Sequence, residues 1–232
     1  MGQLLSKLAA GSLLKLNERG KPIKFIVLGH DHYGAGTGTT LIRKDTYTTT
    51  AFIAASTYNL NAYMGSTLDN ICDCIFPQRL DQDIQSCMVN TPIVVAQGGG
   101  VKTLHTLRRR GWALSCTEVG LSGYATEGTL FSYFSDNAKR VAYLDETTVA
   151  VYWGLRSPNS DSAYAYRVYT DGTLGNDCDV YRPHFAARPA FNLLSSIVVS
   201  NTTDGDGCYT VEDTPAGAGG LYAKNNGIWV RV

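Results

Sequence analysis

Near the start of the chain, apolar residues come in short runs separated by links that contain glycine. The runs at 12–16 and 21–30 flank a four-residue link, which is typical of two strands joined as a hairpin. The glycine-rich stretch at 34–40 predicts a loop, and the apolar positions of 40–47 predict a third strand.

Leucines that precede the first of these strands favour a short amphipathic helix, with Leu4, Leu5 and Leu8 on its apolar face. A secretory leader is the weaker interpretation. Lys7 and Lys15 interrupt the apolar run, and no basic region precedes it.

A helical spacing follows in the second quarter of the chain, where apolar residues recur every three or four positions. One helix is predicted over 65–76 and a second over 80–89, with Pro77 between them. The positions that carry the pattern are Leu68, Ile71, Cys72 and Ile75 in the first helix, and Leu80, Ile84, Cys87 and Met88 in the second.

From Pro92 onward the pattern returns to short apolar runs. The stretch at 97–111 is polar and irregular, which predicts a loop. Strands are predicted at 112–119, 140–144, 148–155, 163–170 and 191–199. Helices early and many strands later predict an α+β domain over 1–200. The extension at 201–232 contains two aromatic runs around an Asn-Asn-Gly turn, which predicts a terminal hairpin.

Composition limits the classes of function. The 232 residues include 20 basic and 20 acidic side chains, so no net field attracts nucleic acid or anionic lipid. The apolar stretches are shorter than the roughly 18 to 20 residues that a membrane helix requires, so no membrane insertion is expected. The six cysteines lack zinc-ribbon spacing, which favours reduced thiols in a protein made in a cytoplasm.

Two glycine-containing stretches resemble catalytic or phosphate-binding motifs, but each lacks a residue that the motif requires. The loop at 34–40 lacks the lysine followed by Ser or Thr that a phosphate loop needs. Ser122 lies in a stretch that resembles a serine-hydrolase elbow, but Tyr124 occupies the position of the second glycine. No catalytic residue is therefore predicted.

Candidate metal and anion sites are also incomplete. His30 and His32 could face the same way on a strand, but polar residues after a strand explain them as well. The acidic turn at 204–207 lacks the ligand set of a calcium loop, and the arginines at 108–110 lack interleaved aromatic residues. We expect no metal and no cofactor.

One region has an unusual composition. Lys, Glu, Gln, Met and Trp total 24 in the chain, and all of them lie outside the 58 residues from Gly154 to Val211, where even scatter would place six. The residues that dominate 159–187 can mostly be encoded with a pyrimidine at the third codon position, whereas those five types cannot. Randomising the adenines of Asn-type codons at their first two positions produces this repertoire.

The same repertoire suits binding. Tyrosine gives rigid contact area with a polar end, and Ser, Asn and Asp give adaptable hydrogen bonds, as in antibody loops. The alternative is an ordinary loop, because Asn, Asp, Ser and Gly also dominate turns. The tyrosines favour binding; they are Tyr152, Tyr164, Tyr166, Tyr169 and Tyr181, with Tyr143 just upstream.

Three motifs frame this region: Y-W-G-L-R-S-P at 152–158, A-Y-R-V-Y-T-D-G at 165–172 and A-R-P-A-F-N-L at 187–193. With the opening at 1–28, they resemble an uncharacterised phage and gut-bacterial domain family with a C-type lectin-like fold. Members of that family include the variable proteins of diversity-generating retroelements. The resemblance covers most of residues 1–200, and Ala186 and Ala187 depart from it where the family has Gly-Val.

The resemblance implies an α+β, C-type lectin-like fold, with twisted antiparallel sheets, two helices and long loops. It implies a phage receptor-binding protein of the tail or fibre. Its partners would be a host cell-surface protein or glycan and other virion tail proteins, with a homotrimer as a guess from the class. The scaffold positions would be Trp153, Leu155, Arg156, Ser157, Pro158, Val168, Gly172, Arg188 and Pro189.

Within the same segment, Tyr166 and Val168 are expected to face the core while Arg167 and Tyr169 face outward, as strand alternation also requires. The predicted ligand-binding positions are Tyr152, Asn159, Asp161, Tyr164, Arg167, Tyr169, Asn176, Asp177, Asp179, Tyr181 and His184. Three alternatives stay open. One is an enzyme related to formylglycine-generating enzymes, which would need a reactive cysteine pair or a metal site, with Cys178 and Cys208 as the candidates. The second is a structural virion protein that binds nothing, and the third is a calcium-dependent sugar lectin, although the E-P-N and W-N-D type ligand motifs are absent.

Overall fold

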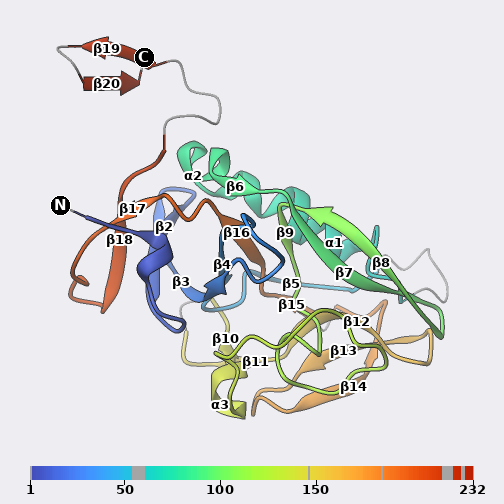
Figure 1. Cartoon of the computed structure of the whole chain (residues 1–232). Helices are drawn as coiled ribbons and strands as arrows, with labels where there is room; N and C mark the ends of the chain where they lie inside the picture. Colours follow the sequence, from blue (N-terminus) through green and yellow to red (C-terminus); the bar gives the residue numbers. More distant parts are fainter. Residues whose placement is uncertain are drawn as a thin grey trace.

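The computed structural model describes residues 2–53, 61–145, 147–183, 185–215, 222–225 and 228–231. Strands dominate this part of the chain and form two larger sheets (Figure 1). The first sheet has nine strands in the order β1 (Gln3–Leu4), β17 (Val198–Val199), β18 (Cys208–Asp213), β2 (Leu13–Glu18), β3 (Lys21–His30), β4 (Thr39–Arg43), β16 (Ala190–Leu193) and β6 (Met88–Val89), and β9 (Gly111–Trp112) also pairs with β16. The hairpin predicted at the start of the chain is β2–β3.

The second sheet contains the strands of the first part of the segment of unusual composition, up to Ala187. Its order is β14 (Leu174–Asp179), β13 (Tyr164–Val168), β12 (Trp153–Pro158), β15 (Phe185–Ala187) and β5 (Thr48–Thr50). Two-stranded ribbons complete the described strands: β7 (Thr91–Gly98) with β8 (Val101–Arg109), β10 (Ala142–Tyr143) with β11 (Ala150–Val151), and β19 (Tyr222–Asn225) with β20 (Ile228–Arg231). The last ribbon is the predicted terminal hairpin, although its turn residues 226–227 lie outside the described residues.

Strand β3 explains why the nine-stranded sheet has a core on both faces. Its apolar run is unbroken, and successive side chains of a strand point to opposite faces. Ile26 and Leu28 pack in one buried cluster, which also contains Trp112 and the five-stranded sheet's Trp153. Phe25 and Val27 pack in the other cluster.

The predicted α+β class with two helices is wrong. Strands make up 42% of the residues and helical turns 12%, so the fold is mostly β. The three described α-helices are α1 (Thr67–Asn70), α2 (Gln82–Ser86) and α3 (Asn137–Arg140), each only about one turn long. Their sequences have helical spacing, but single turns cannot form a layer against a sheet.

Competing contacts shorten each predicted helix. The segment predicted over 65–76 continues from α1 as a π-turn, Ile71–Ile75, and then a 3-10 turn begins at Pro77. The segment predicted over 80–89 stops at Ser86 because Met88 and Val89 pair with β16 instead. The amphipathic helix predicted at the N-terminus is a single 3-10 turn, Leu5–Lys7, because β1 occupies the residues before it.

Two further predictions need correction. The polar stretch at 97–111 is not an irregular loop, since most of it forms β8 and pairs with β7 over seven positions. The stretch at 112–119 is not a strand beyond Trp112, because Ser115 and Val119 close a turn by a backbone hydrogen bond of 3.2 Å. None of the helices among the described residues has the length and apolar character needed to cross a membrane.

Candidate functional site

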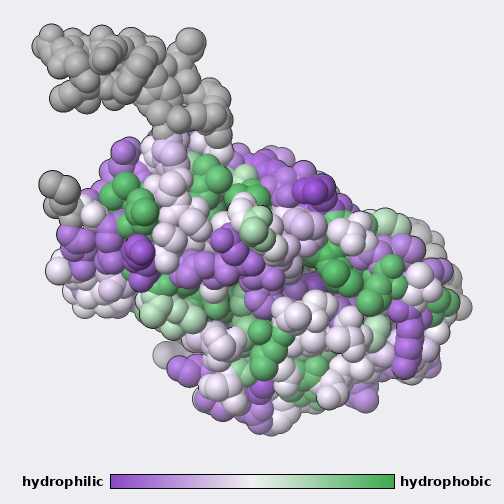
Figure 2. Space-filling view, viewed as in Figure 1, coloured by the Kyte–Doolittle hydropathy of each residue, from purple (hydrophilic) through white to green (hydrophobic). Residues whose placement is uncertain are grey.

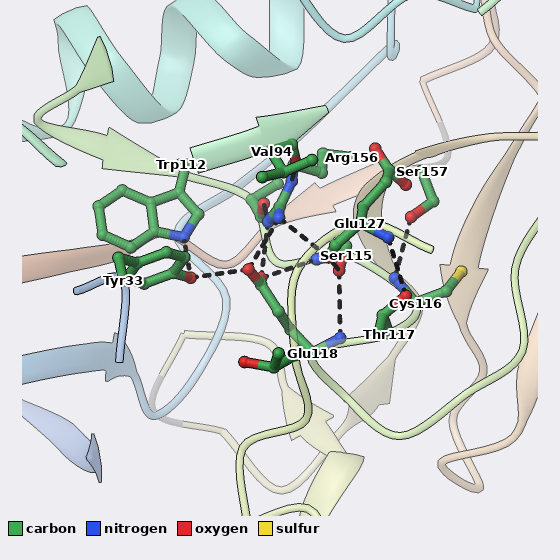
Figure 3. A network of polar contacts seen from close by, with 12 residues as sticks. Tyr33, Val94, Trp112, Ser115, Cys116, Thr117, Glu118, Glu127, Arg156 and Ser157 are labelled. Atoms are coloured by element: carbon green, nitrogen blue, oxygen red, sulfur yellow. Dashed lines mark hydrogen bonds and ion pairs between the residues drawn. The ribbon is translucent and has the colours of Figure 1, made fainter. Parts of the chain in front are cut away.

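A fully buried ion pair joins the segment of unusual composition to an earlier part of the chain. Arg156 of β12 bonds the Glu118 carboxylate with both terminal nitrogens, at 2.6 and 2.7 Å, and neither side chain is exposed. Tyr33 donates to the same carboxylate at 2.9 Å, and the backbone N–H of Ser115 donates at 3.1 Å. Figure 3 shows these groups converging on Glu118. Both oxygens of the buried Glu118 carboxylate therefore accept hydrogen bonds, and its negative charge is balanced by Arg156.

The remaining donors of Arg156 tie it to the neighbouring elements. Its Nε donates to the carbonyl of Val94 in β7 at 2.9 Å, and one terminal nitrogen also donates to the carbonyl of Ala113 at 3.1 Å. Nearby, Glu127 accepts from the Ala96 N–H at 2.8 Å through Oε1, while its buried Oε2 has no hydrogen-bond partner. Burial raises the pKa of Glu127. We call Arg156, Glu118, Ser115 and Glu127 the buried base.

A second buried arginine supports the other end of β12. Arg188 donates to the carbonyls of Arg43, Lys44 and Arg140 at 3.0, 2.9 and 3.3 Å, and its guanidinium lies 4.9 Å from the centre of the Trp153 ring. Burial lowers the pKa of Arg188 to about 10. Arg156 and Arg188, two of the three arginines in the motifs at 152–158, 165–172 and 187–193, thus hold neighbouring segments of the core together.

On the surface, four of the predicted ligand-binding residues form one cluster. The Arg167 guanidinium lies 4.6 Å from the Tyr152 ring centre and 5.1 Å from that of Tyr169, and the two rings meet edge to face at 5.5 Å. Asp177 closes the cluster, accepting from the Tyr169 hydroxyl at 2.8 Å and pairing with Arg167 at 3.4 Å. We call Tyr152, Arg167, Tyr169 and Asp177 the exposed patch.

Strand register brings the exposed patch together. Trp153 pairs with Val168, so Tyr152 and Tyr169 lie at neighbouring ends of β12 and β13. Gly175 pairs with Arg167 from the other side, and a Cβ atom there would stand 2.6 Å from the Tyr169 ring. The missing side chain lets that ring lie over β14. The hydrogen bond between Tyr169 and Asp177 raises the pKa of the hydroxyl and lowers that of the carboxyl.

The tight link between β13 and β14 is equally specific. Gly172 has a positive φ of 82°, and a Cβ atom there would lie 1.9 Å from the carbonyl oxygen of Asn137. Only glycine accommodates both the dihedral angle and the close approach. Gly172 is one of the positions that the family resemblance treats as scaffold.

A separate contact holds the loop between β12 and β13. The buried Asn61 donates from Nδ2 to the carbonyls of Asn159, Asp161 and Tyr164, at 2.9, 3.0 and 2.7 Å. Its Oδ1 accepts from the N–H of Gly99 at 2.7 Å. We call this residue the Asn61 clasp. It ties the loop to the tip of the β7–β8 ribbon.

The other predicted positions lie beside these two features. Asn159 donates to the carbonyl of Asn176, and Tyr164 pairs with Asp179 across the ladder of β13 and β14. Tyr181 follows β14 and is 52% exposed. Asp161 is exposed within the clasped loop, whereas His184 lies outside the described residues.

Burial separates the two sets of positions that the resemblance distinguishes. All nine scaffold positions are buried. None of the ten described ligand-binding positions is buried. Of the residues expected to face the core, Val168 is fully buried, whereas Tyr166 is half-buried and packs at the edge of the core.

Next to the exposed patch lies a hollow of about 330 Å³, with Val151, Tyr152, Thr170 and Pro183 in its wall. Another hollow, of about 450 Å³, lies on the nine-stranded sheet, beside Lys15 and Thr210. We place the candidate site at the smaller hollow, because it adjoins a cluster of aromatic and charged side chains. Such clusters dominate binding energies at interfaces.

Sequence reasoning missed Asn61 and Gly175, and it considered Cys178 only as half of a reactive cysteine pair. Arg167 donates to the Cys178 sulfur at 3.4 Å, and burial raises the pKa of that thiol to about 11. Asn61 precedes the segment by about a hundred residues, so no local pattern links them. The need for glycine at position 175 can be recognised only once the strand pairing of Gly175 with Arg167 is known.

The structure gives little support to a reactive cysteine pair, a histidine metal site or a calcium turn. Cys178 and Cys208 belong to different sheets, and all six cysteines are free thiols. His30 bonds Thr39 and the carbonyl of Leu8, whereas His32 stacks on Phe131 at 3.6 Å. The acidic turn at 204–207 is engaged by Lys15, which pairs with both of its carboxylates and lowers the pKa of Asp204 to about 2.

The sequence was compared with models of protein families. A family model described as DUF6273, a domain of unknown function, matches residues 37–195. The chain belongs to the DUF6273 family. No curated protein and no solved structure matches it. The DUF6273 match contains the buried base, the exposed patch and the Asn61 clasp, whereas β1–β3 and β17–β18 lie outside it.

Proposed function

We propose that this DUF6273 chain is a phage-encoded variable ligand-binding protein. The exposed patch, the clasped loop and Tyr181 form a hypervariable surface that a diversity-generating retroelement diversifies. This surface attaches the phage to a host surface protein or glycan. The chain is a binding module and not an enzyme, and it works on the virion tail or fibre, beside other tail proteins, after synthesis in the bacterial cytoplasm.

The observation that carries the proposal is the division of burial within one segment. Positions that the family resemblance treats as constant are buried and hydrogen-bonded, and positions that it treats as variable are accessible. A surface can change its side chains without loss of the fold only if none of them supports the core. The ten described ligand-binding positions meet this requirement better than the rest of 152–183, because none of the ten is buried.

The chemistry of the exposed patch supports binding. Tyr152 and Tyr169 hold the Arg167 guanidinium between them, so the cluster is ordered before a ligand arrives. Tyrosine and arginine are enriched among the residues that dominate binding energy, and preorganisation lowers the entropic cost of association. The adjoining hollow of about 330 Å³ offers room for one side chain or one sugar ring of the partner.

A host-binding experiment tests the function. The whole chain is immobilised and used to capture a ligand from host cell envelopes, and its affinity is then compared among three variants. Tyr169→Ala and Tyr181→Ala each weaken binding by more than about 1 kcal/mol if these side chains are anchors. Tyr143→Ala is the matched control, because Tyr143 is 37% exposed on β10 and lies outside the predicted set.

The proposal fails if both anchor variants bind the captured ligand as tightly as the parent chain. A genetic test is independent of the ligand. Sequencing around the gene is expected to reveal a reverse-transcriptase gene and a near-copy of the segment for 152–193 that differs only at adenines. A neighbourhood without either contradicts diversification, though not binding.

A further inference from the structure

The two edges of the β7–β8 ribbon differ in how their backbone groups are satisfied. On the free edge of β7, Arg156 donates to the Val94 carbonyl and Glu127 accepts from the Ala96 N–H. On the free edge of β8, no described residue bonds the backbone of 101–107. The buried base therefore bonds one edge of the ribbon, and the other edge has no partner among the described residues.

An open edge of this length is uncommon. Strand β8 has nine residues, and the six from Val101 to Thr106 are all exposed. Natural proteins keep edge strands short or cover them, because unpaired N–H and C=O groups accept a strand from another chain. Val101 and Leu104 add exposed apolar surface, and Figure 2 shows hydrophobic patches among hydrophilic residues on the face where this ribbon lies.

The charges along β8 indicate what such a strand would carry. Arg109 is neutralised by Asp69, which accepts from its Nε and Nη2 at 2.8 Å each. Lys102 lies over the Tyr124 ring at 4.5 Å, and Arg108 donates to the carbonyl of Asn90 at 3.3 Å. Neither of these exposed cations forms an ion pair with a carboxylate of the described residues. One uncompensated positive charge thus lies near each end of the strand.

The ribbon also adjoins the proposed binding surface. Its tip is held by the Asn61 clasp, which bonds Gly99 on one side and the loop at 159–164 on the other. A Cβ atom at Gly100 would lie 3.1 Å from the Ser160 carbonyl oxygen, so the tip and the loop are in contact. A partner on the exposed patch could therefore reach β8.

We infer that the free edge of β8 binds an extended, acidic segment of a protein partner by strand addition. Hydrogen bonds between the backbone of β8 and that of the partner provide the affinity, and the positive charges of Lys102 and Arg108 favour Asp and Glu in the partner segment. A second copy of the chain is a poorer occupant, because antiparallel pairing centred on His105 places Lys102 opposite Arg108. The inference rests on the proposed function for the location of the partner, and it deepens that function by favouring a protein over a glycan.

A peptide probe tests the inference on the whole chain. The probe is an end-blocked, fluorescent peptide of alternating glutamate and valine, nine residues long to match β8. We expect saturable binding by fluorescence anisotropy. The double variant Lys102→Glu/Arg108→Glu is expected to weaken it about tenfold, since two attractions become repulsions. Lys7→Glu, at an exposed lysine on the N-terminal turn, is the matched control and leaves affinity unchanged.

Backbone pairing is tested separately with two N-methylated versions of the probe. In an antiparallel pair, alternate residues direct their N–H groups toward the partner strand. Methylation of one alternate set abolishes binding, and methylation of the other set preserves it. Equal binding of both versions, absence of binding to the parent peptide, or an equal effect of Lys7→Glu overturns the inference.

The same assay separates this inference from the proposed function. Tyr169→Ala leaves the peptide affinity unchanged, because the exposed patch does not touch the β8 edge. If the peptide binds as expected while Tyr169→Ala and Tyr181→Ala leave the host ligand bound, the proposed function fails and the strand site stands. If the host ligand depends on the tyrosines but no peptide binds β8, only the strand site fails.

Discussion

Arg156 and Arg167 lie on adjacent strands, each beside an acid and an aromatic side chain, yet they have opposite roles. Arg156 is fully buried and makes two bonds to Glu118, shorter than 3 Å. Arg167 lies between two tyrosine rings with 14% of its side chain exposed, and it pairs at 3.4 Å with Asp177, whose side chain is 64% exposed. Its Nε is buried and has no hydrogen-bond partner among the described residues. Burial, and not residue type, decides which of the two arginines the fold depends on.

The physical reason is the cost of desolvation. A buried charge that loses its partner cannot be rescued by water, whereas an exposed charge can. The buried base must therefore stay complete, whereas the exposed patch, none of whose four residues is fully buried, tolerates substitution better. The predictions below test this contrast, from the largest expected effect to the smallest.

Removal of Arg156 has the largest effect. Arg156→Ala leaves Glu118 charged and unpaired in the core, which we expect to lower the free energy of unfolding by about 3–5 kcal/mol. Arg167→Ala, the matched change on β13, lowers it by less than about 1 kcal/mol. Urea denaturation of both variants measures the difference, and equal losses would contradict the contrast.

The Asn61 clasp comes next. Asn61→Ala removes one buried donor group that serves three carbonyls, and it leaves the Gly99 N–H without its acceptor. We expect a loss of about 1–3 kcal/mol in the free energy of unfolding. Hydrogen exchange of 159–164 should accelerate in this variant, while Asn159→Ala, on the exposed side of the same loop, changes stability little.

Glu127 gives the buried base a pH dependence. Its pKa in the folded chain lies above the ordinary value of 4.5, so the unfolded chain releases the proton first as pH rises. Stability therefore falls as pH rises from about 4.5 until it passes the raised pKa. Glu127→Gln removes this slope, and parallel stability curves for the two proteins over that range would exclude the effect.

The smallest effect lies in the exposed patch. Tyr169→Phe removes the hydroxyl that donates to Asp177 at 2.8 Å, the main cause of the lowered pKa of that carboxyl. An NMR titration of the Asp177 carboxyl should show its pKa rising toward the ordinary value in the variant. An unchanged pKa would mean that the hydrogen bond is absent in solution.

The strands were more predictable from the sequence than the fold class. Alternation and glycine-containing links located β2, β3, β13 and the terminal hairpin. The α+β class was wrong because helical spacing at 65–89 carried no information on whether the turns would continue. Pro77 and the pairing of Met88 and Val89 with β16 stopped them, and strand pairing over such distances leaves no local pattern.

For the candidate site, the sequence indicated which residues are accessible but not how they meet. The composition of 154–211 and the motifs around it pointed to Tyr152, Arg167 and Tyr169. Their contacts depend on the register between β12, β13 and β14 and on a glycine at 175. The support from Asn61 and Glu118 comes from distant segments, so only the folded chain brings them to the site.

The most direct measurement combines the four patch positions in one variant: Tyr152→Ser, Arg167→Ser, Tyr169→Ser and Asp177→Asn. We expect a Tm within about 4 °C of the parent chain, because none of the four residues is fully buried and the one charge pair among them, Arg167 with Asp177, reaches solvent. Arg156→Ala alone should lower the Tm by about 10 °C. Loss of host-ligand capture by the combined variant at an unchanged Tm is the predicted result, and unfolding of that variant would contradict the account.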